Sequence, residues 1–266
     1  MISVVCVTCN RLHLFRDTIE KVIANATDDV KEIVLWNNAS TDDTPAYLDG
    51  IDDPRVRVVH HPDNIGTNAY AQAFELTTQP YLIELDDDII DAPQGWDRML
   101  LDAYQKAGDL GFLASNIVND GKSIASQVFY ERDAHLFEPY EHNGVRLLKG
   151  PVGGYCTMTD RETMRAVGGF PQHPDQVFFH EDAEYANRVQ QAGKRIALLA
   201  DLKVFHASGP AYSSSATVDA AKAKFYEQRD AKRHRKRRIK RWVHALPLMP
   251  AINRRYKLYA VDFLDD

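Results

Sequence analysis

Over the first 90 residues, stretches with the hydrophobic pattern of buried strands alternate with stretches that have the pattern of helices. Short, β-branched apolar runs suit strands that are buried on both faces of a parallel sheet. Between them, apolar residues recur at helical spacing. This pattern predicts strands at 2–7, 33–36, 56–59 and 81–85, and helices at 12–23 and 69–76. Alternation of strand and helix predicts a doubly wound α/β sheet, with ligands bound at the edge where its strands end.

The pattern changes after residue 110, where the apolar runs become shorter and polar loops separate them. Strands are predicted at 111–114, 124–130, 145–149, 195–199 and 204–206, and helices at 160–167 and 181–192. Gly193 follows the second of these helices, where a glycine commonly ends a helix. Breaker residues between Gly209 and Ser215 then predict a boundary. We expect an α/β domain at 1–212 and a basic helical extension at 213–266.

The composition suits a globular protein with its own core. The chain has 266 residues, of which 44% are hydrophobic and 26% are charged. No apolar run approaches the about 18 residues that span a bilayer, and we find no pattern of a signal peptide. Its three cysteines are odd in number and lack metal-ligand spacing, so we expect reduced thiols. These features favour a cytoplasmic protein.

The positive charge is concentrated in residues 222–257, which we call the basic segment. It contains 14 Lys and Arg against Glu227 and Asp230, a net charge of +12, so the remainder carries −18 of the total of −6. Basic residues beside Trp242 and Leu246 suit an anionic membrane surface, which would place the protein peripherally at the inner face of a membrane. Self-association through the acidic body is an equal alternative. Nucleic acid is less favoured because the acidic body would repel a duplex.

Three consecutive carboxylates, Asp86, Asp87 and Asp88, directly follow the predicted strand at 81–85. Adjacent carboxylates repel one another unless a cation or solvent relieves the repulsion. Their oxygen atoms are the ligands that Mg²⁺ and Mn²⁺ prefer, often together with substrate phosphates. The three aspartates therefore form either a metal site or an exposed acidic turn.

Other polar residues are ambiguous when each is taken alone. Glu181 and Asp182 open a predicted helix, where the dipole favours acidic residues but would also keep a base ionised. His206 follows an apolar run and is by itself more typical of a structural histidine. The polar loop at 37–44 is first of all a turn with a helix cap, although with residues 8–11 it could line a nucleotide pocket.

Taken in order, these pieces resemble the family-2 glycosyltransferases with the GT-A fold, over roughly residues 1–210. The matching stretches are VVCVTCNR, IVLWNNASTDDT, NIGTNAYAQAF, YLIELDDDI, GGYCTMTDRETMRAVGGF, FFHEDAEYANRVQQAGKRI and VFHASG. The resemblance implies a Rossmann-like, mixed and mostly parallel sheet flanked by helices. It also implies transfer of a sugar, with inversion, from a nucleotide-diphosphate donor that is held by a divalent metal.

The resemblance also assigns roles to residues. It implies that Asp88 and His206 bind Mn²⁺ or Mg²⁺ together with Asp86, and that Asp182 is the catalytic base, with Glu181 as the alternative. Asn37 stands where many relatives carry an aspartate that contacts a pyrimidine base, and its amide oxygen can still accept from uracil, so a UDP-sugar is favoured. The implied donor-binding residues are Thr8, Asn10, Arg11, Asn37, Asn38, Asn64, Gly66, Asn68, Asp86, Asp87, Gly153 and Gly154.

Several alternatives for the substrate and the activity stay open. The resemblance favours a glycan or a lipid-linked glycan as the acceptor, and the same chemistry on a protein or a modified nucleic acid is the alternative. A catalytically inactive domain that binds nucleotide or carbohydrate is a hypothesis of another class. The joint presence of Asp86, Asp88, Asp182 and His206 favours an active enzyme.

Overall fold

A computed structural model describes residues 1–119 and 137–207, together with individual helical residues between 220 and 243. The chain divides into two units, Met1–Val218 and Asp219–Asp266. The strand predicted at 124–130 and the boundary predicted after residue 212 lie outside the described residues. Within the described part of the chain, no helix combines the length and the apolar character that crossing a bilayer requires.

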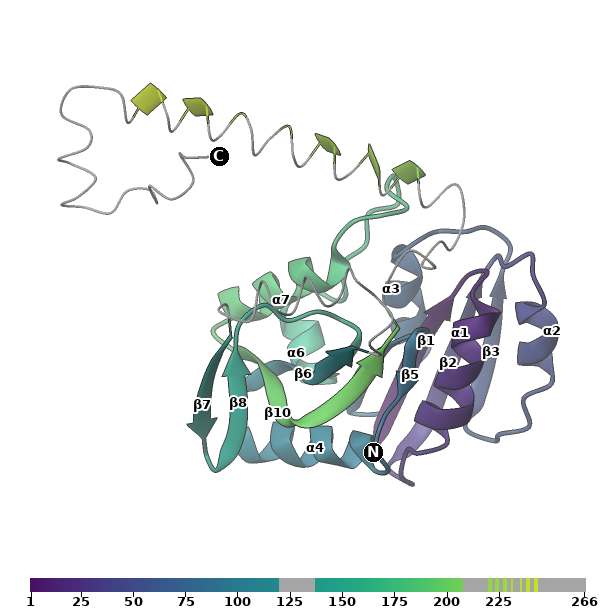
Figure 1. The fold of residues 1–266 in the computed structure, drawn as a ribbon, viewed down its shortest axis with the longest axis horizontal. Coiled ribbons are helices and arrows are strands. Elements are labelled where there is room, and N and C mark those ends of the chain that lie inside the picture. Colours follow the sequence, from purple (N-terminus) through teal and green to yellow (C-terminus); the bar gives the residue numbers. More distant parts are fainter. Residues whose placement is uncertain are drawn as a thin grey trace. The chain divides into compact units, whose positions relative to one another are not determined.

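The first unit is built on one mixed ten-stranded sheet (Figure 1). Its strand order is β3-β2-β1-β4-β9-β6-β10-β8-β7, with β5 paired to β10. The strands are β1 Ile2–Thr8, β2 Val30–Asn38, β3 Val56–His61, β4 Tyr81–Asp86, β5 Ile89–Asp91, β6 Leu110–Asn119, β7 Glu138–His142, β8 Val145–Lys149, β9 Cys156–Asp160 and β10 Arg195–His206. The first four strands are parallel, and β9 runs antiparallel between β4 and β6. The carboxyl ends of β1, β2, β4, β6 and β10 therefore meet at one edge of the sheet.

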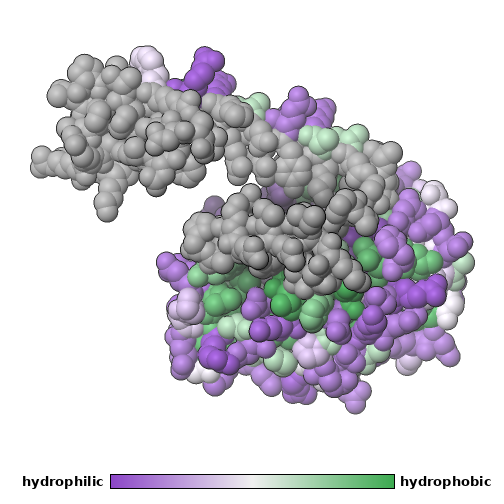
Figure 2. All heavy atoms as spheres, viewed as in Figure 1, coloured by the Kyte–Doolittle hydropathy of each residue, from purple (hydrophilic) through white to green (hydrophobic). Residues whose placement is uncertain are grey.

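Helices cover both faces of this sheet (Figure 1). They are α1 Leu12–Asp17, the π-helical η1 Thr18–Ile23, α2 Thr44–Asp49, α3 Asn68–Glu75, α4 Trp96–Ala107, α6 Arg161–Ala166 and α7 Glu181–Gln191. One buried cluster joins the sheet to α1, η1, α2 and α4, and a second joins it to α3, α6 and α7. In β1, Val4 and Cys6 belong to the first cluster and Val5 to the second, so this strand is buried on both faces, as predicted. On the side drawn in Figure 2, the described surface is mostly hydrophilic.

The predicted α/β fold is confirmed, and the strands and helices expected within the described residues of the first unit are present. The two strands predicted at 195–199 and 204–206 form one strand, β10, whose pairing with β6 shifts register between Leu199 and Lys203. The helix α4 was not predicted, although Trp96, Leu100 and Tyr104 bury one face of it. The strands β5, β7 and β9 were also missed, and α2 was expected only as a capped turn.

Asp160 caps the start of α6. Its carboxylate accepts hydrogen bonds from the backbone N–H of Thr163 at 2.6 Å and from the hydroxyl of Tyr104 at 2.5 Å. Replacing Asp160 with alanine is expected to lower the free energy of unfolding by about 1–2 kcal/mol, because these donors lose their acceptor. Urea denaturation measures this loss. Asp201→Ala is the control: it removes only an exposed pair with Arg146 and should change stability by less than about 0.5 kcal/mol, so equal losses would contradict the capping role.

Candidate active site

The three residues predicted to bind metal meet at the carboxyl edge of the sheet. Asp86 ends β4, Asp88 follows two residues later, and His206 ends β10. One ligand atom from each lies within 4.8 Å of the others. Nε2 of His206 is 3.3 Å from Oδ1 of Asp88 and 3.8 Å from Oδ2 of Asp86. The parallel pairing of β6 with β10 and the antiparallel β9 bring these distant parts of the sequence to one place.

This cluster fits a divalent cation. Two carboxylates and an imidazole form a donor set suited to Mn²⁺, and the carboxylates alone suit Mg²⁺. Asp88 is completely buried, and among the described residues its Oδ1 receives no well-aligned hydrogen bond. The imidazole of His206 lies 3.3 Å from this oxygen, and a cation bound between the two side chains would satisfy it. Asp86, Asp88 and His206 therefore form a candidate metal centre.

Arg11 lies against the acidic run from the protein side. Its Nη1 is 2.7 Å from Asp87 and its Nη2 is 2.6 Å from Asp88. Burial would raise the pKa of Asp88, but the charges of His206 and Arg11 outweigh it and hold that pKa well below its usual range. Burial raises the pKa of Asp87 to about 7, against the opposing charge of Arg11. The guanidinium of Arg11 thus offsets the negative charges of Asp87 and Asp88. Its contact with the nucleotide-sugar donor stays a prediction.

The pKa of His206 lies well above its ordinary value. Burial alone would lower its pKa, but the negative charges of Asp88 and Asp86 outweigh that effect and raise it to about 10. Two aromatic residues that the sequence did not point to complete the surroundings. The hydroxyl of Tyr70 donates to Oδ1 of Asp86 at 2.9 Å, and the ring of Tyr155 meets that of His206 edge-on, with centroids 6.2 Å apart. The imidazole is therefore protonated, and it must lose that proton in order to bind a metal ion.

A second group of carboxylates lies where α7 begins. Oδ2 of Asp182 accepts the backbone N–H of Gly154 at 3.2 Å, and its Oδ1 accepts the N–H of Ala183 at 2.6 Å. Burial raises the pKa of Asp182, and these two N–H groups act against that rise. Burial and then the charge of Asp182 raise the pKa of Glu181 well above its usual range. Of the two candidate bases, Asp182 is the one whose carboxylate accepts the backbone N–H groups of two other residues.

Glu84 is a third carboxylate of this group, and the sequence analysis missed it. It lies inside β4, its side chain is 2% exposed, and a side chain on Gly154 would collide with its carboxyl group. Burial raises its pKa well above the usual range, and the charges of Glu181, Asp86 and Asp182 add to this. The signal was present in the sequence: a charged residue interrupts an apolar strand, on the same face as Asp86.

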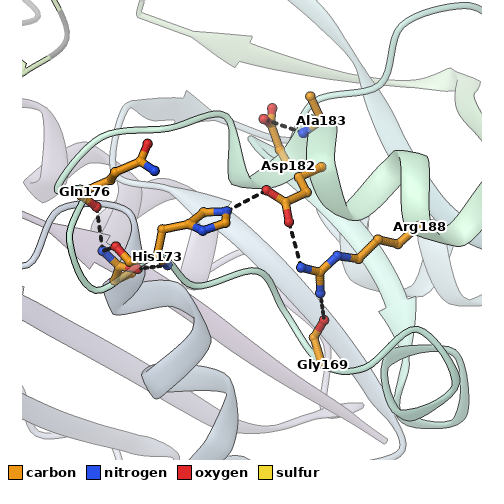
Figure 3. A network of polar contacts seen from close by, with 8 residues as sticks. Gly169, His173, Gln176, Asp182, Ala183 and Arg188 are labelled. Atoms are coloured by element: carbon orange, nitrogen blue, oxygen red, sulfur yellow. Dashed lines mark hydrogen bonds and ion pairs between the residues drawn. The ribbon is translucent and has the colours of Figure 1, made fainter. Parts of the chain in front are cut away.

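Polar contacts join the segment before α7 to α7 itself, the helix that carries Asp182 (Figure 3). Glu184 lies 2.8 Å from Nε2 of His173 and accepts a 2.6 Å hydrogen bond from Arg188. Arg188 also reaches the backbone oxygen of Gly169, at 3.5 Å. These contacts fix the first turn of α7, and hence Asp182, relative to the preceding loop.

The predicted donor-side loop packs against the same segment. The side chain of Asn68 donates to the carbonyl oxygens of His173 and Gln176, at 3.2 and 2.8 Å. Gly66 has a φ of +62°, and a Cβ there would lie 1.5 Å from the carbonyl oxygen of Val177. Only glycine fits this backbone and this close approach. The loop at 64–68 and the segment before α7 are thus brought together.

The remaining predicted donor-binding residues hold the loops at the ends of β1 and β2. Oδ1 of Asn10 accepts the backbone N–H of Thr41 at 2.7 Å, and Oδ1 of Asn37 accepts that of Ser40 at 2.9 Å. Thr8, Asn38 and Asn64 lie at this same edge, where Asn38 donates to Asn64 at 3.0 Å. The structure therefore places these residues in loops at the carboxyl edge of the sheet, and their contact with a nucleotide stays a prediction.

Comparisons with known proteins agree with this geometry. The family model described as glycosyl transferase family 2 matches residues 3–167. Among solved structures, a mannosyltransferase, PcManGT from Pyrobaculum calidifontis in complex with GDP-Man and Mn²⁺, has a TM-score of 0.55 and 19% identity, over 79% of this chain and 57% of that chain. GalNAc-T7 with UDP, GalNAc and Mn²⁺ has a TM-score of 0.58 and 17% identity, over 79% of this chain and 44% of that chain.

TarS from S. aureus has a TM-score of 0.59 and 15% identity, over 79% of this chain and 37% of that chain. The chain thus spans about half the length, or less, of these three proteins. No curated protein matches the sequence significantly. The structures share the fold, and the family model covers more than half of the chain. The chain therefore belongs to glycosyl transferase family 2 and has the GT-A fold.

Proposed function

We propose that the protein transfers a sugar from a nucleoside-diphosphate donor to an acceptor hydroxyl, with the help of a divalent cation. One observation carries the proposal: one ligand atom from each of Asp86, Asp88 and His206 lies within 4.8 Å of the others. The similar structures solved with Mn²⁺ and GDP-Man, or with Mn²⁺ and UDP, support it.

The residues divide the chemistry between them. Asp86, Asp88 and His206 would hold the cation, which when bound offsets the negative charge on the departing diphosphate. Asp182 accepts the proton of the acceptor hydroxyl as that oxygen attacks the anomeric carbon. Attack by the acceptor itself, without a covalent intermediate, inverts the configuration at this carbon.

For the donor we favour a UDP-sugar, because the amide oxygen of Asn37 can accept from the imide of uracil. For the acceptor we favour a glycan or a lipid-linked glycan, with a protein or a modified nucleic acid as the alternative. A panel of UDP- and GDP-sugars with Mn²⁺ tests this, with release of the nucleoside diphosphate as the readout. We expect release that EDTA abolishes and that a suitable acceptor accelerates. An inactive binding domain would raise its melting temperature with a nucleotide sugar but release no diphosphate.

The affinity for Mn²⁺ is expected to rise with pH. His206 must lose its proton to bind the ion, and its pKa of about 10 lies above the physiological range. Between pH 7 and pH 9 each added pH unit should raise the affinity by about tenfold, with one proton released for each ion bound. Calorimetry in buffers of different ionisation enthalpy measures both quantities. A His206→Gln variant should bind weakly at every pH, and a wild-type affinity that did not change with pH would contradict the assignment.

We also propose that the basic segment binds the anionic inner face of a membrane. Two of its described residues are large, apolar and exposed: Ile239 is 52% exposed and Trp242, three positions later, is 67% exposed. Exposed apolar residues among Lys and Arg are typical of binding to lipid headgroups. We expect cosedimentation with phosphatidylglycerol vesicles that weakens in high salt and in an Ile239→Ser, Trp242→Ser variant, but not with phosphatidylcholine vesicles. A dimer in light scattering without vesicle binding would favour self-association instead.

A further inference from the structure

Glu84 occupies a position at which the sheet itself needs an apolar residue. It lies in β4, between β1 and β9, and is 2% exposed. Ile83 and Leu85 fill the core on one face of this strand, while Leu82 fills it on the face of Glu84. A carboxyl group in such surroundings is unfavourable unless something binds it. The fold gives no reason for a carboxyl group at this place.

The protein makes room for this carboxyl group with a glycine. A Cβ on Gly154 would lie 2.3 Å from Oε2 of Glu84 and 2.4 Å from its Oε1. Gly154 is not among the residues with positive φ, so the space, and not the backbone conformation, calls for glycine. The N–H of Gly154 donates to Asp182. Glu84 is therefore packed directly against the loop that holds the predicted base.

Within the described part of the chain, the carboxyl group has no hydrogen-bond donor at its buried oxygen. Oε2 of Glu84 is shielded from solvent and receives no hydrogen bond. The charged groups that act on it are Glu181, Asp86 and Asp182, and all of them are acidic. Buried polar atoms in native proteins are nearly always paired, so an orphaned one calls for an explanation such as a bound molecule. A ligand that brings its own donor would satisfy Oε2.

We propose that Glu84 is a specificity-determining residue that accepts a hydrogen bond from a hydroxyl group of the transferred sugar. This inference rests on the proposed function, in which the diphosphate lies at Asp86 and the attacking hydroxyl at Asp182. The transferred sugar links these two points. Glu84 lies two residues before Asp86 on β4 and packs against Gly154, whose N–H donates to Asp182. The substrate class is accordingly a nucleotide sugar with a free hydroxyl group that can donate to Glu84.

Binding measurements with and without the sugar test this inference. Calorimetry with Mn²⁺ gives the dissociation constants of UDP, GDP, UDP-glucose and GDP-mannose for the wild type, Glu84→Gln and Glu84→Met. For the nucleotide that binds, Glu84→Met should raise the ratio of the sugar-conjugate constant to the diphosphate constant by about 3–10-fold, as expected for a lost hydrogen bond to an uncharged carboxyl group. The constant for the diphosphate itself should stay within about threefold. Glu84→Gln keeps an acceptor oxygen and should show a smaller change.

Two comparisons separate this role from a structural one. Leu82→Met, on the same strand and face, is the matched control and should leave the ratio unchanged. Glu84→Met should be at least as stable as the wild type, because it removes a buried carboxyl group without a partner. An unchanged ratio with normal diphosphate binding would overturn the inference alone. A wild type that binds none of these nucleotides with Mn²⁺ would overturn the proposed function, and the inference with it.

Discussion

Replacing Asp182 with asparagine is expected to slow sugar transfer by about 10²–10⁴-fold, the range for removal of a general base. The amide cannot accept a proton from the acceptor. Its single oxygen can keep one of the two hydrogen bonds that Asp182 accepts, from Gly154 or from Ala183, because these reach different oxygens. The side chain keeps nearly the same shape, so the fold and the donor affinity should persist. Steady-state rates, together with calorimetry of the nucleotide sugar, measure the two effects separately.

The pH profile gives a second readout for Asp182. Because burial raises its pKa, the base gains its ionised form only above the usual range of an aspartate, and the rate should rise with pH through that raised value. The asparagine variant should lack this rise. Glu181→Gln is the control, with a smaller expected loss. An active Asp182→Asn beside an inactive Glu181→Gln would transfer the role of base to Glu181.

Asp88→Asn is expected to weaken Mn²⁺ binding by at least about 100-fold. Loss of a residue that only hydrogen-bonds to a metal ligand already lowers the affinity by about 10–100-fold, and loss of a charged ligand should cost more. Metal-dependent binding of the donor should disappear with it. Asparagine has nearly the same shape, and its side-chain oxygen can still accept a hydrogen bond from Arg11, which now donates to Asp88 at 2.6 Å. This choice avoids leaving the buried guanidinium without that acceptor, so the melting temperature of the metal-free protein should change little. Calorimetric titration with Mn²⁺ gives the affinity.

Asp91→Asn is the matched control for this experiment. Asp91 lies three residues further along the chain, on β5, and is exposed. Its variant should bind Mn²⁺ as the wild type does. Normal Mn²⁺ affinity in Asp88→Asn would refute the assignment of Asp88 as a ligand, and equal losses in both variants would point to a general effect of negative charge.

Local pattern was sufficient for most of the sheet. The runs in β1 and β2 are apolar on both faces, and few other structures accommodate such runs. β3 and β4 kept enough of this pattern to be predicted, although each contains a charged residue, Arg57 or Glu84. The antiparallel strand β9 was missed because Thr157 and Thr159 interrupt its apolar pattern, although both are buried. The hydroxyl of Thr159 donates to the carbonyl oxygen of Gly111, a partner that lies 48 positions away and that no local pattern contains.

The missed helix has a different cause. The apolar face of α4, with Trp96 and Leu100, was readable at helical spacing, but three apolar residues next to one another at 99–101 obscure the period. The glycines at its two ends, Gly95 and Gly108, both adopt the left-handed conformation that favours glycine. They mark the limits of the helix once its middle is known.

The sequence by itself determined which chemical groups this chain carries and at the end of which strand or helix each one lies. The acidic run after β4, the acidic pair that opens α7 and the histidine that ends β10 all follow apolar or helical patterns within a few residues. Contacts over long sequence distances decided the rest: the distance of Asp88 from His206, the pairing of Arg11 with the acidic run, and the burial of Glu84 against Gly154. Burial and the charges of distant neighbours set the protonation of each group, and only the folded chain brings those neighbours together.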